Sequence, residues 1–302
     1  MRVLITGGTG NIGRRLIDVL LNHGHQVLIL SRKSLKPAWL PTQVGLLRWD
    51  GQTARGWGEQ VNQIDAIINL AGAGIADERW SDARKRLILE SRVQAGQAVV
   101  EAICAAQAKP AVLVQASGIN YYGTSQTKTF TEADGPGDDY LADVCVRWEA
   151  STSPVEALGV RRAIIRSGVV LDPAGGALPK LVMPFNFFAG GWLGSGQQWM
   201  SWIHWQDAVA AIRFLIENEA ASGPFNLVTP EPVHNKAMAK TIGQVMGRPA
   251  LAPAPGFALK LVFGEMATVV LEGQRVLPER LRQLGFEFTW PQLEPALQDL
   301  LK

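Results

Sequence analysis

The sequence has few cysteines. Cys104 and Cys145 are the only two among 302 residues, and neither has a second cysteine or a histidine at metal-ligand spacing. This scarcity excludes a disulfide framework and gives no indication of a zinc site. We therefore expect a reducing, cytoplasmic compartment and no bound metal.

A one-signed charge excess and a long apolar run are also lacking. The 29 Lys and Arg residues nearly balance 27 Asp and Glu residues, and no basic tail or charged block occurs. Nucleic acid is therefore not an expected partner. The most apolar stretch, residues 181–193, is interrupted by Pro184, Gly190 and Gly191, so it is not expected to span a membrane. The first residues already have the pattern of a strand, so we do not expect an apolar leader. The sequence does not indicate the oligomeric state.

The most informative segment that is present comprises residues 1–32. Residues 3–5 are apolar and predict a buried strand, and apolar residues at helical spacing follow a glycine-rich turn. Gly7 permits the tight turn, Gly10 lets the backbone approach a pyrophosphate, and Gly13 lets the helix pack close to the sheet. A helix that begins near Asn11 would direct its free N–H groups at the phosphates. The segment predicts a dinucleotide-binding unit.

The end of the second strand indicates which dinucleotide binds. NAD-preferring folds place an Asp or Glu about 20 residues after the glycines. This chain has Ser31, Arg32 and Lys33 there instead. A guanidinium can bind a 2′-phosphate through charge-assisted hydrogen bonds, whereas a carboxylate would repel it. We therefore predict NADP(H) as the cofactor; the alternative is that Arg32 and Lys33 are only solvated loop charges.

The alternation of strands and helices continues through the first half of the chain. It predicts an α/β fold, a Rossmann-type doubly wound parallel sheet with a smaller, mostly helical C-terminal lobe. We assign residues 1–170 plus 206–229 to the NADP-binding domain, and 171–205 plus 230–302 to a substrate-side lobe. The expected strands cover 44–49, 65–70, 111–116, part of 161–170 and 224–228, and the expected helices cover 82–106, 141–158 and 207–218.

Four tryptophans gather in the predicted lobe between residues 192 and 205. A cleft between the two parts would suit a small substrate. Trp202 and His204 are candidates to line that cleft, and His204 could exchange a proton there. The alternative is that this aromatic cluster is the core of the lobe itself.

Several motifs resemble the extended branch of the short-chain dehydrogenase/reductase superfamily. They are TGGTGNIG at 6–13, NLAG at 69–72, ASGINYYG at 116–123 and WIHWQDAV at 202–209. The chain is more closely similar to an atypical "epimerase family" group, called nucleoside-diphosphate-sugar epimerase-like or cell-division-inhibitor-like. Residues 79–92, 140–150 and 166–171 carry this closer resemblance, and 263–288 resemble the C-terminal domain of unassigned function in that group.

The resemblance implies a set of coenzyme contacts that extends beyond the glycine turn. These contacts include the end of the fourth strand, a helix position where relatives use Asn, and the segment after the sixth strand, which would lie near the nicotinamide. The implied coenzyme-binding residues are Gly7, Thr9, Gly10, Asn11, Ile12, Gly13, Ser31, Arg32, Leu70, Ala71, Gly72, Arg92 and Val170.

The catalytic residues implied by the resemblance are incomplete. Active members of the superfamily combine a Ser with a Tyr and with a Lys four residues after that Tyr. Ser117 matches the Ser, and Tyr121 and Tyr140 are candidate phenols, but Val144 and Cys145 stand where the Lys would be. One hypothesis is an NADP(H)-dependent oxidoreductase or epimerase-type enzyme acting on a small polar substrate. The alternative is a catalytically silent NADP(H)-binding sensor. Glu265 and Glu272 are expected to form an internal ion pair with Arg275.

Overall fold

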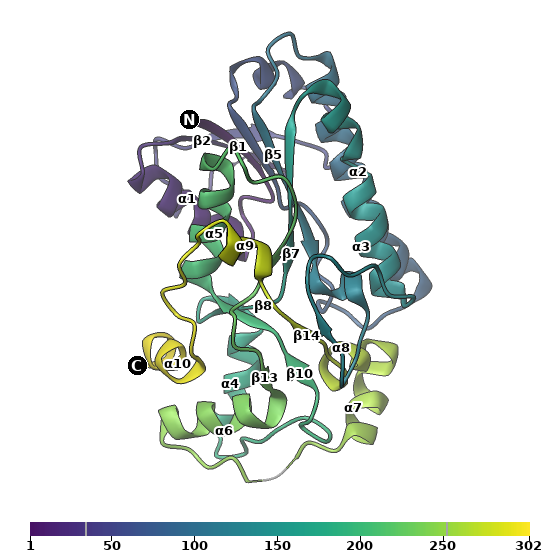
Figure 1. Cartoon of the computed structure of the whole chain (residues 1–302), viewed down its shortest axis with the longest axis vertical. Coiled ribbons are helices and arrows are strands. Elements are labelled where there is room, and N and C mark those ends of the chain that lie inside the picture. Colours follow the sequence, from purple (N-terminus) through teal and green to yellow (C-terminus); the bar gives the residue numbers. More distant parts are fainter. Residues whose placement is uncertain (34, 252) are drawn as a thin grey trace.

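The computed structural model describes residues 1–33, 35–251 and 253–302. Its centre is a parallel sheet with the strand order β12-β7-β5-β4-β1-β2-β3 and helices on both faces (Figure 1). This architecture confirms the predicted doubly wound α/β fold. The strands are β1 (Arg2–Thr6), β2 (Gln26–Ser31), β3 (Gly45–Arg48), β4 (Ala66–Asn69), β5 (Val112–Gly118), β7 (Arg161–Ser167) and β12 (Gly223–Leu227).

Alternating side chains of β1 build the two apolar layers. Val3 and Ile5 pack in one core with residues of α1 (Asn11–Asn22) and α5 (Trp205–Glu217), whereas Leu4 packs in a second core with α2 (Asp82–Ala105). The chain leaves β1 toward β2 on one side and reaches β4 on the other, so the order reverses between β1 and β4. The carboxyl edge at such a switch point is where α/β sheets bind ligands.

The helix expected over 141–158 is shorter than predicted. It forms as α3 (Tyr140–Ala150), and a separate 3-10 turn, η3 (Ser153–Leu158), follows it. Pro154 explains the break, because proline lacks an N–H group and its ring collides with the carbonyl group four residues earlier in a continuous helix.

The remaining elements are short. A three-stranded sheet and two strand pairs join segments that are distant in sequence, and the C-terminal part is mostly helical, as predicted. The other strands are β6 (Thr129–Phe130), β8 (Val169–Asp172), β9 (Gly175–Gly176), β10 (Trp199–Met200), β11 (Trp202–His204), β13 (Val233–His234) and β14 (Arg275–Val276). The other helices are α4 (Leu178–Asn186), α6 (Asn235–Met246), α7 (Gly256–Phe263), α8 (Thr268–Leu271), α9 (Glu279–Gln283) and α10 (Leu293–Leu301), with 3-10 turns η1 (Gly58–Gln63), η2 (Ile119–Tyr122) and η4 (Gly264–Ala267).

Trp202 and His204 lie in the core, so their predicted place in a substrate cleft is wrong. Both are 0% exposed. The Trp202 ring packs with residues of α4, α6 and α10, and its indole N–H donates to the Glu231 carbonyl group. His204 Nδ1 accepts from the Gln206 backbone at the start of α5, and its Nε2 binds Asp299 at 3.2 Å. The aromatic cluster therefore stabilises the lobe.

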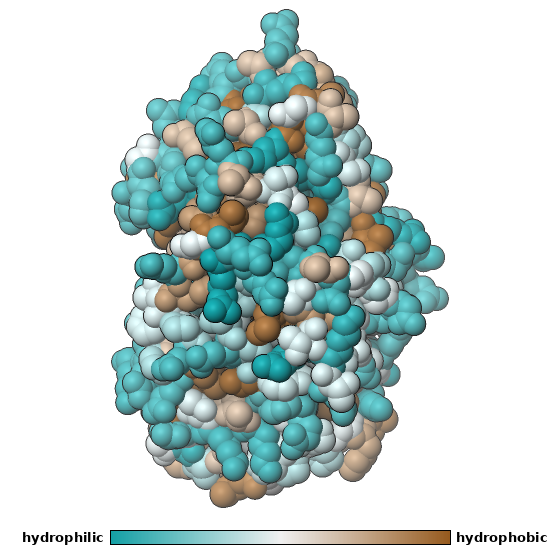
Figure 2. All heavy atoms as spheres, in the orientation of Figure 1, coloured by the Kyte–Doolittle hydropathy of each residue, from teal (hydrophilic) through white to brown (hydrophobic). Residues whose placement is uncertain are grey.

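Polar side chains cover most of the face in Figure 2, with apolar residues in small, separate groups. Among the helices of the described ranges, none is both long and apolar enough to cross a membrane.

The division of the chain into an NADP-binding domain, 1–170 plus 206–229, and a substrate-side lobe, 171–205 plus 230–302, stays a prediction.

Candidate functional site

The glycine turn after β1 is sterically closed to larger residues. Gly7 has a φ of +68°, and a Cβ atom there would lie 2.8 Å from the backbone of Leu70. A Cβ atom on Gly13 would lie 2.6 Å from the Gly7 carbonyl oxygen. The Gly10 N–H donates to that same oxygen at 2.9 Å. The turn therefore brings the start of α1 against the sheet.

The start of α1 has no internal partner for its positive end. Gly10 is the N-cap residue, no side chain caps the helix, and its first turn holds no acidic residue. The first helical bond runs from the Arg14 N–H to the Gly10 carbonyl group at 3.0 Å. The N–H groups of Asn11 and Ile12, together with Gly13, thus face the carboxyl edge of β1, where an anion would be stabilised.

A row of polar groups aligns the edges of β1, β4 and β5. The Thr6 hydroxyl donates to Asn69 at 2.5 Å and accepts from the Ala71 N–H at 3.2 Å. The Asn69 amide donates to Gln115 at 2.8 Å. Leu70 and Ala71 are thereby held against the glycine turn, where the resemblance places them. The sequence offers only one signal of this row, the polar residues Thr6, Asn69 and Gln115 within or at the ends of apolar strands.

Arg92 on α2 lies beside the segment that follows β4. Its Nη1 donates to the Ala73 and Ile88 carbonyl groups, each at 2.9 Å, and its guanidinium lies over the Trp148 ring. Burial lowers the pKa of Arg92 and repulsion from Arg84 adds to this, yet no carboxylate of the described chain pairs with it. Arg92 is therefore a buried cation next to Gly72, and its contact with the coenzyme stays a prediction.

The edge at the end of β2 is cationic. Ser31 faces Arg48 in the register of β2 and β3, and Arg32 and Lys33 follow. None of these three basic residues forms an ion pair with a carboxylate in the ranges that the structure describes. Asp50 accepts hydrogen bonds from its own turn, which lower its pKa against the opposing effect of desolvation. A phosphate would find the cations of Arg32, Lys33 and Arg48 here, with the nearby carboxylate of Asp50 engaged by its own turn.

Val170 reaches the same region through the hairpin of β8 and β9. Its carbonyl oxygen lies 3.8 Å from the position that a Cβ atom on Gly176 would take. A Cβ atom on the neighbouring Gly175 would be 2.8 Å from Asn11 Oδ1. The segment after β7 therefore meets the first turn of α1, and the position of Val170 near the nicotinamide stays a prediction.

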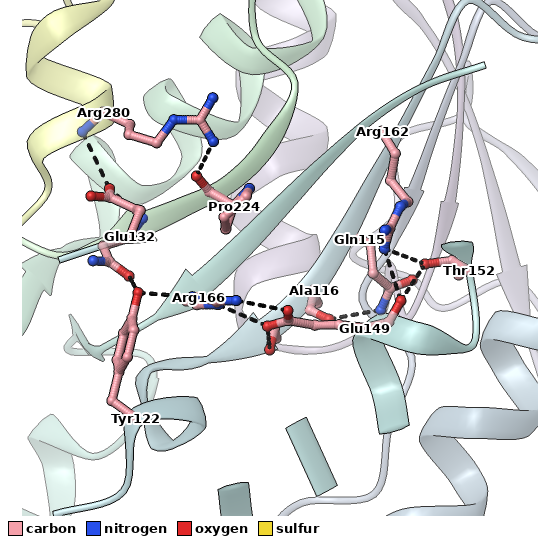
Figure 3. A network of polar contacts seen from close by, with 12 residues as sticks. Gln115, Ala116, Tyr122, Glu132, Glu149, Thr152, Arg162, Arg166, Pro224 and Arg280 are labelled. Carbon is pink, nitrogen blue, oxygen red and sulfur yellow. Dashed lines mark hydrogen bonds and ion pairs between the residues drawn. The ribbon is translucent and has the colours of Figure 1, made fainter. Parts of the chain in front are cut away.

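Ser117 joins a buried ion pair of Glu149 and Arg166, the two residues that Figure 3 shows at the centre of a polar network. Its hydroxyl donates to Glu149 Oε1 at 2.7 Å. Both oxygens of Glu149 accept from Arg166, each at 2.9 Å. Burial opposes the charge of Arg166, but the hydrogen bonds and attraction from Glu149 outweigh it and raise the pKa of the guanidinium. The Ser117 hydroxyl thus completes a structural pair that sequence reasoning missed.

The two adjacent tyrosines also attach to this network. Arg166 Nη1 donates to the Tyr122 hydroxyl at 3.0 Å, and that hydroxyl donates to Asn226 at 2.7 Å. Burial raises the pKa of Tyr122 to about 12. The Arg166 guanidinium lies 3.4 Å from the ring centre of Tyr121. Tyr121 therefore covers a buried cation with its ring, and its catalytic role stays a prediction.

The region of the expected Tyr and Lys is apolar apart from Tyr140. Leu141 and Cys145 are buried on α3, and burial raises the pKa of the Cys145 thiol to about 11. The Tyr140 hydroxyl donates to the Lys85 carbonyl group at 2.8 Å, and burial raises the pKa of this phenol. The positive charge of Arg92 opposes this rise in the pKa of Tyr140 and of Cys145, because it favours their ionised forms. No Lys lies four residues after Tyr140, and the Lys85 ammonium, 5.0 Å from the Tyr140 ring centre, pairs with Glu265. The usual Tyr and Lys pair of the superfamily is therefore incomplete.

A small pocket of about 130 Å³ opens beside Tyr140. Three carboxylates line it, together with two amides and several apolar and hydroxyl side chains; the lining residues are Asp139, Glu265, Glu272, Asn120, Gln274, Trp80, Thr124, Tyr140, Leu141, Thr268 and Val269. We call it the α3 pocket. It brings together the end of β5, the start of α3 and the segment 265–274, which only the folded chain makes neighbours.

The predicted ion pair of Glu265 and Glu272 with Arg275 is wrong. Glu265 binds Lys85 at 2.5 Å, and Glu272 accepts from the Thr124 hydroxyl at 3.0 Å. Arg275 lies over the Trp199 ring instead. The three residues separate because α8 ends at Leu271 and the chain then extends into β14.

Replacing Ser117 with alanine tests whether its hydroxyl is structural. The Ser117→Ala variant should lose about 1 kcal/mol of unfolding free energy, because one hydrogen bond to Glu149 disappears while Arg166 stays paired. Urea denaturation measures this loss. Coenzyme affinity, measured by calorimetry, should be unchanged; a tenfold weaker affinity would show that the hydroxyl contacts the coenzyme.

The fold and the glycine turn define a dinucleotide-binding protein of the extended short-chain dehydrogenase/reductase type. Residues 3–228 match the family model described as the NAD dependent epimerase/dehydratase family, and 254–300 match a domain of unknown function called DUF1731. The chain belongs to this epimerase/dehydratase family, which confirms the resemblance. Within the described ranges, no group of His, Cys, Asp and Glu could hold a metal ion.

Relatives cover the entire chain. The Bacillus subtilis epimerase family protein YfhF is 41% identical over 302 residues, which cover 100% of this chain and 98% of the relative. A chloroplastic Arabidopsis thaliana SDR39U1 homologue is 42% identical over 100% of this chain and 87% of its own. The crystal structure of human SDR39U1 isoform 2 with NADPH superposes with a TM-score of 0.90, at 34% identity and 99% coverage of both chains. A Corynebacterium glutamicum nucleoside-diphosphate sugar epimerase gives a TM-score of 0.81 at 31% identity, over 100% of this chain and 58% of that one.

Proposed function

We propose that this protein binds NADP(H) and acts as an oxidoreductase or epimerase-type enzyme on a small polar substrate. The observation that carries the coenzyme assignment is the uncapped start of α1 beside a cationic edge at Ser31 and Arg32. The human relative that was crystallised with NADPH supports the phosphorylated coenzyme over NAD. The diphosphate would lie on the turn of residues 7–13, and the 2′-phosphate at Arg32.

The bound coenzyme would supply hydride transfer, and the chain would orient the reactants and exchange the proton. Arg92 would donate hydrogen bonds to the coenzyme beside Gly72, because it is a buried cation without a carboxylate partner. The α3 pocket would hold the substrate beyond the end of β5. Tyr140 is the phenol of that pocket and our candidate for the proton-exchanging group. No Lys lies four residues after it, so we expect turnover to be slow at neutral pH.

A panel assay tests this function. The purified protein is mixed with NADPH and, separately, with NADP⁺, and the absorbance of the reduced nicotinamide is followed against small carbonyls, alcohols and nucleotide sugars. Oxidation or reduction with any panel member that is lost in Tyr140→Phe supports the enzyme. Epimerisation regenerates the coenzyme, so NMR of the panel members detects it. Tight NADPH binding with neither an absorbance change nor an epimerised product for any panel member contradicts the proposal.

One observation favours a second candidate, an NADP(H)-binding sensor without hydride chemistry. Ser117 donates its hydroxyl to Glu149, and Leu141 and Cys145 fill the positions of the Tyr and Lys. A sensor would change shape with coenzyme redox state instead of turning over substrate. Different proteolysis patterns with NADPH and NADP⁺, in the absence of turnover, would favour this candidate.

Reversing the charge of Arg32 tests the coenzyme preference. In Arg32→Glu, the affinity for NADPH should fall about 10- to 100-fold, because a charge-assisted contact is replaced by repulsion. The affinity for NADH should change little. Arg282→Glu is the matched control, since Arg282 lies exposed on α9, away from the glycine turn. Calorimetry that shows an unchanged NADPH preference in Arg32→Glu would refute the phosphate assignment.

The cellular compartment and the binding partners of the protein stay predictions. We propose a reducing, cytoplasm-like compartment, since Cys104 and Cys145 are both free thiols in the structure. A small molecule is the expected partner, and neither nucleic acid nor a membrane is expected to bind.

A further inference from the structure

We propose that the α3 pocket selects a small amine-bearing polar substrate and rejects nucleoside diphosphates. This inference rests on the proposed function and specifies its substrate class. It departs from the name of the Corynebacterium relative, which refers to nucleotide sugars. The charge, the hydrogen-bonding groups and the size of the pocket each support it.

The charge on the pocket wall is negative. Asp139, Glu265 and Glu272 line it, whereas no Lys or Arg does. Lys85 neutralises Glu265 at the edge of the pocket, where its ammonium lies 5.0 Å from the Tyr140 ring centre, and Asp139 caps α3 by accepting from the Ala142 N–H at 2.9 Å. Glu272 receives only a neutral hydroxyl among its described neighbours. Two negative charges therefore remain, and they would attract an ammonium group and repel a phosphate.

Two amides inside the pocket have no hydrogen-bond partner among the described residues. Gln274 is 4% exposed and lines the pocket, yet only its backbone carbonyl group bonds the protein, by accepting from the Ser201 hydroxyl. The Asn120 amide also lines the pocket without a bond to another described side chain or backbone group. Neither amide belongs to the sealed, unpartnered groups of the described chain, so both are accessible to hydrogen-bond a polar ligand. Both amides can donate to a carbonyl or hydroxyl oxygen and can also accept from an ammonium group.

The size of the pocket agrees with a small ligand. Its volume of about 130 Å³ is below the roughly 300–1,000 Å³ typical of sites for drug-sized molecules. A nucleoside diphosphate sugar would need space for a base, a ribose and a diphosphate, and cations for its charge. The α3 pocket provides neither.

Ligand-observed NMR on the NADPH-saturated protein tests the proposal. The probes are glucosamine with glucose and glucose 6-phosphate, ethanolamine with ethylene glycol, and UDP-glucose. We expect each amine to bind about 3- to 10-fold more tightly than its uncharged parent, as one partly exposed charge pair would give. Glucose 6-phosphate and UDP-glucose should show no saturable binding. Calorimetry establishes NADPH binding first, so a failure of the proposed coenzyme site is recorded separately.

Variants show whether the pocket carboxylates cause the preference. In Asp139→Asn/Glu272→Gln, which removes the two remaining charges and keeps a cap acceptor on α3, the amine preference should disappear while NADPH affinity stays unchanged. Glu287→Gln removes the charge of an exposed residue between α9 and α10 and should keep the preference. The proposal is overturned if neither amine binds the wild-type protein, if UDP-glucose binds more tightly than the amines, or if the double variant retains the full preference.

Discussion

Replacing Glu149 with alanine is expected to lower the unfolding free energy by about 3–5 kcal/mol. The side chains of Glu149 and Arg166 are 10% and 5% exposed, and the carboxylate receives both guanidinium bonds. Without Glu149, Arg166 would keep its charge inside the protein, with only the Tyr122 hydroxyl and the aromatic rings around it. Denaturation by urea, followed by circular dichroism, measures the loss.

Two further variants separate the ion pair from the loss of side-chain volume. Glu156→Ala is the matched control, because Glu156 pairs with Arg162 from the same strand as Arg166 but is 54% exposed. It should cost less than about 1 kcal/mol. The double variant Glu149→Leu/Arg166→Met removes both charges and should recover much of the stability. A loss for Glu149→Ala as small as that for Glu156→Ala would contradict the buried-pair interpretation.

Replacing Gly13 with alanine should weaken NADPH binding by about 10- to 100-fold. The new Cβ atom would lie 2.6 Å from the Gly7 carbonyl oxygen and 2.7 Å from Gly8 Cα, so the turn or the helix must shift. The N–H groups at the start of α1 would then lose their alignment with the diphosphate, and each charged hydrogen bond contributes about 1.5–3 kcal/mol. Calorimetry with NADPH measures the change in affinity.

Gly135→Ala supplies the matched control for Gly13→Ala. Gly135 has an ordinary φ, and a Cβ atom there would meet nothing within 4 Å. This variant should bind NADPH like the wild type. The role given to the glycine turn fails if Gly13→Ala folds normally and binds NADPH as tightly as Gly135→Ala.

Much of the fold could be predicted because its units are local. A short apolar strand, a glycine turn and an amphipathic helix lie consecutively within residues 2–31, and the same alternation recurs to β7. The one misjudged helix, 141–158, had its break in the sequence as Pro154. The position of Trp202 was harder to predict, since an aromatic cluster has the same composition in a cleft and in a core. The pairing of β11 with β8 places its ring inside.

The candidate site likewise has one part that the sequence predicts and another that only the folded chain reveals. The glycine turn could be recognised because its residues are adjacent in sequence. The α3 pocket could not, because Asn120 and Gln274 come together only when the C-terminal segment packs against the end of β5. Ser117 illustrates a different limit. Its position in a motif predicts a catalytic hydroxyl, which stays a prediction. The motif does not indicate the carboxylate that receives this hydroxyl, because Glu149 lies 32 residues further along the chain.

Isothermal titration of the wild-type protein with NADPH and with NADH tests the central claim most directly. A helix start free of carboxylates and a basic edge at Arg32 should bind NADPH at least tenfold more tightly than NADH. Heat of binding with neither coenzyme, or an equal affinity for both, would contradict the account.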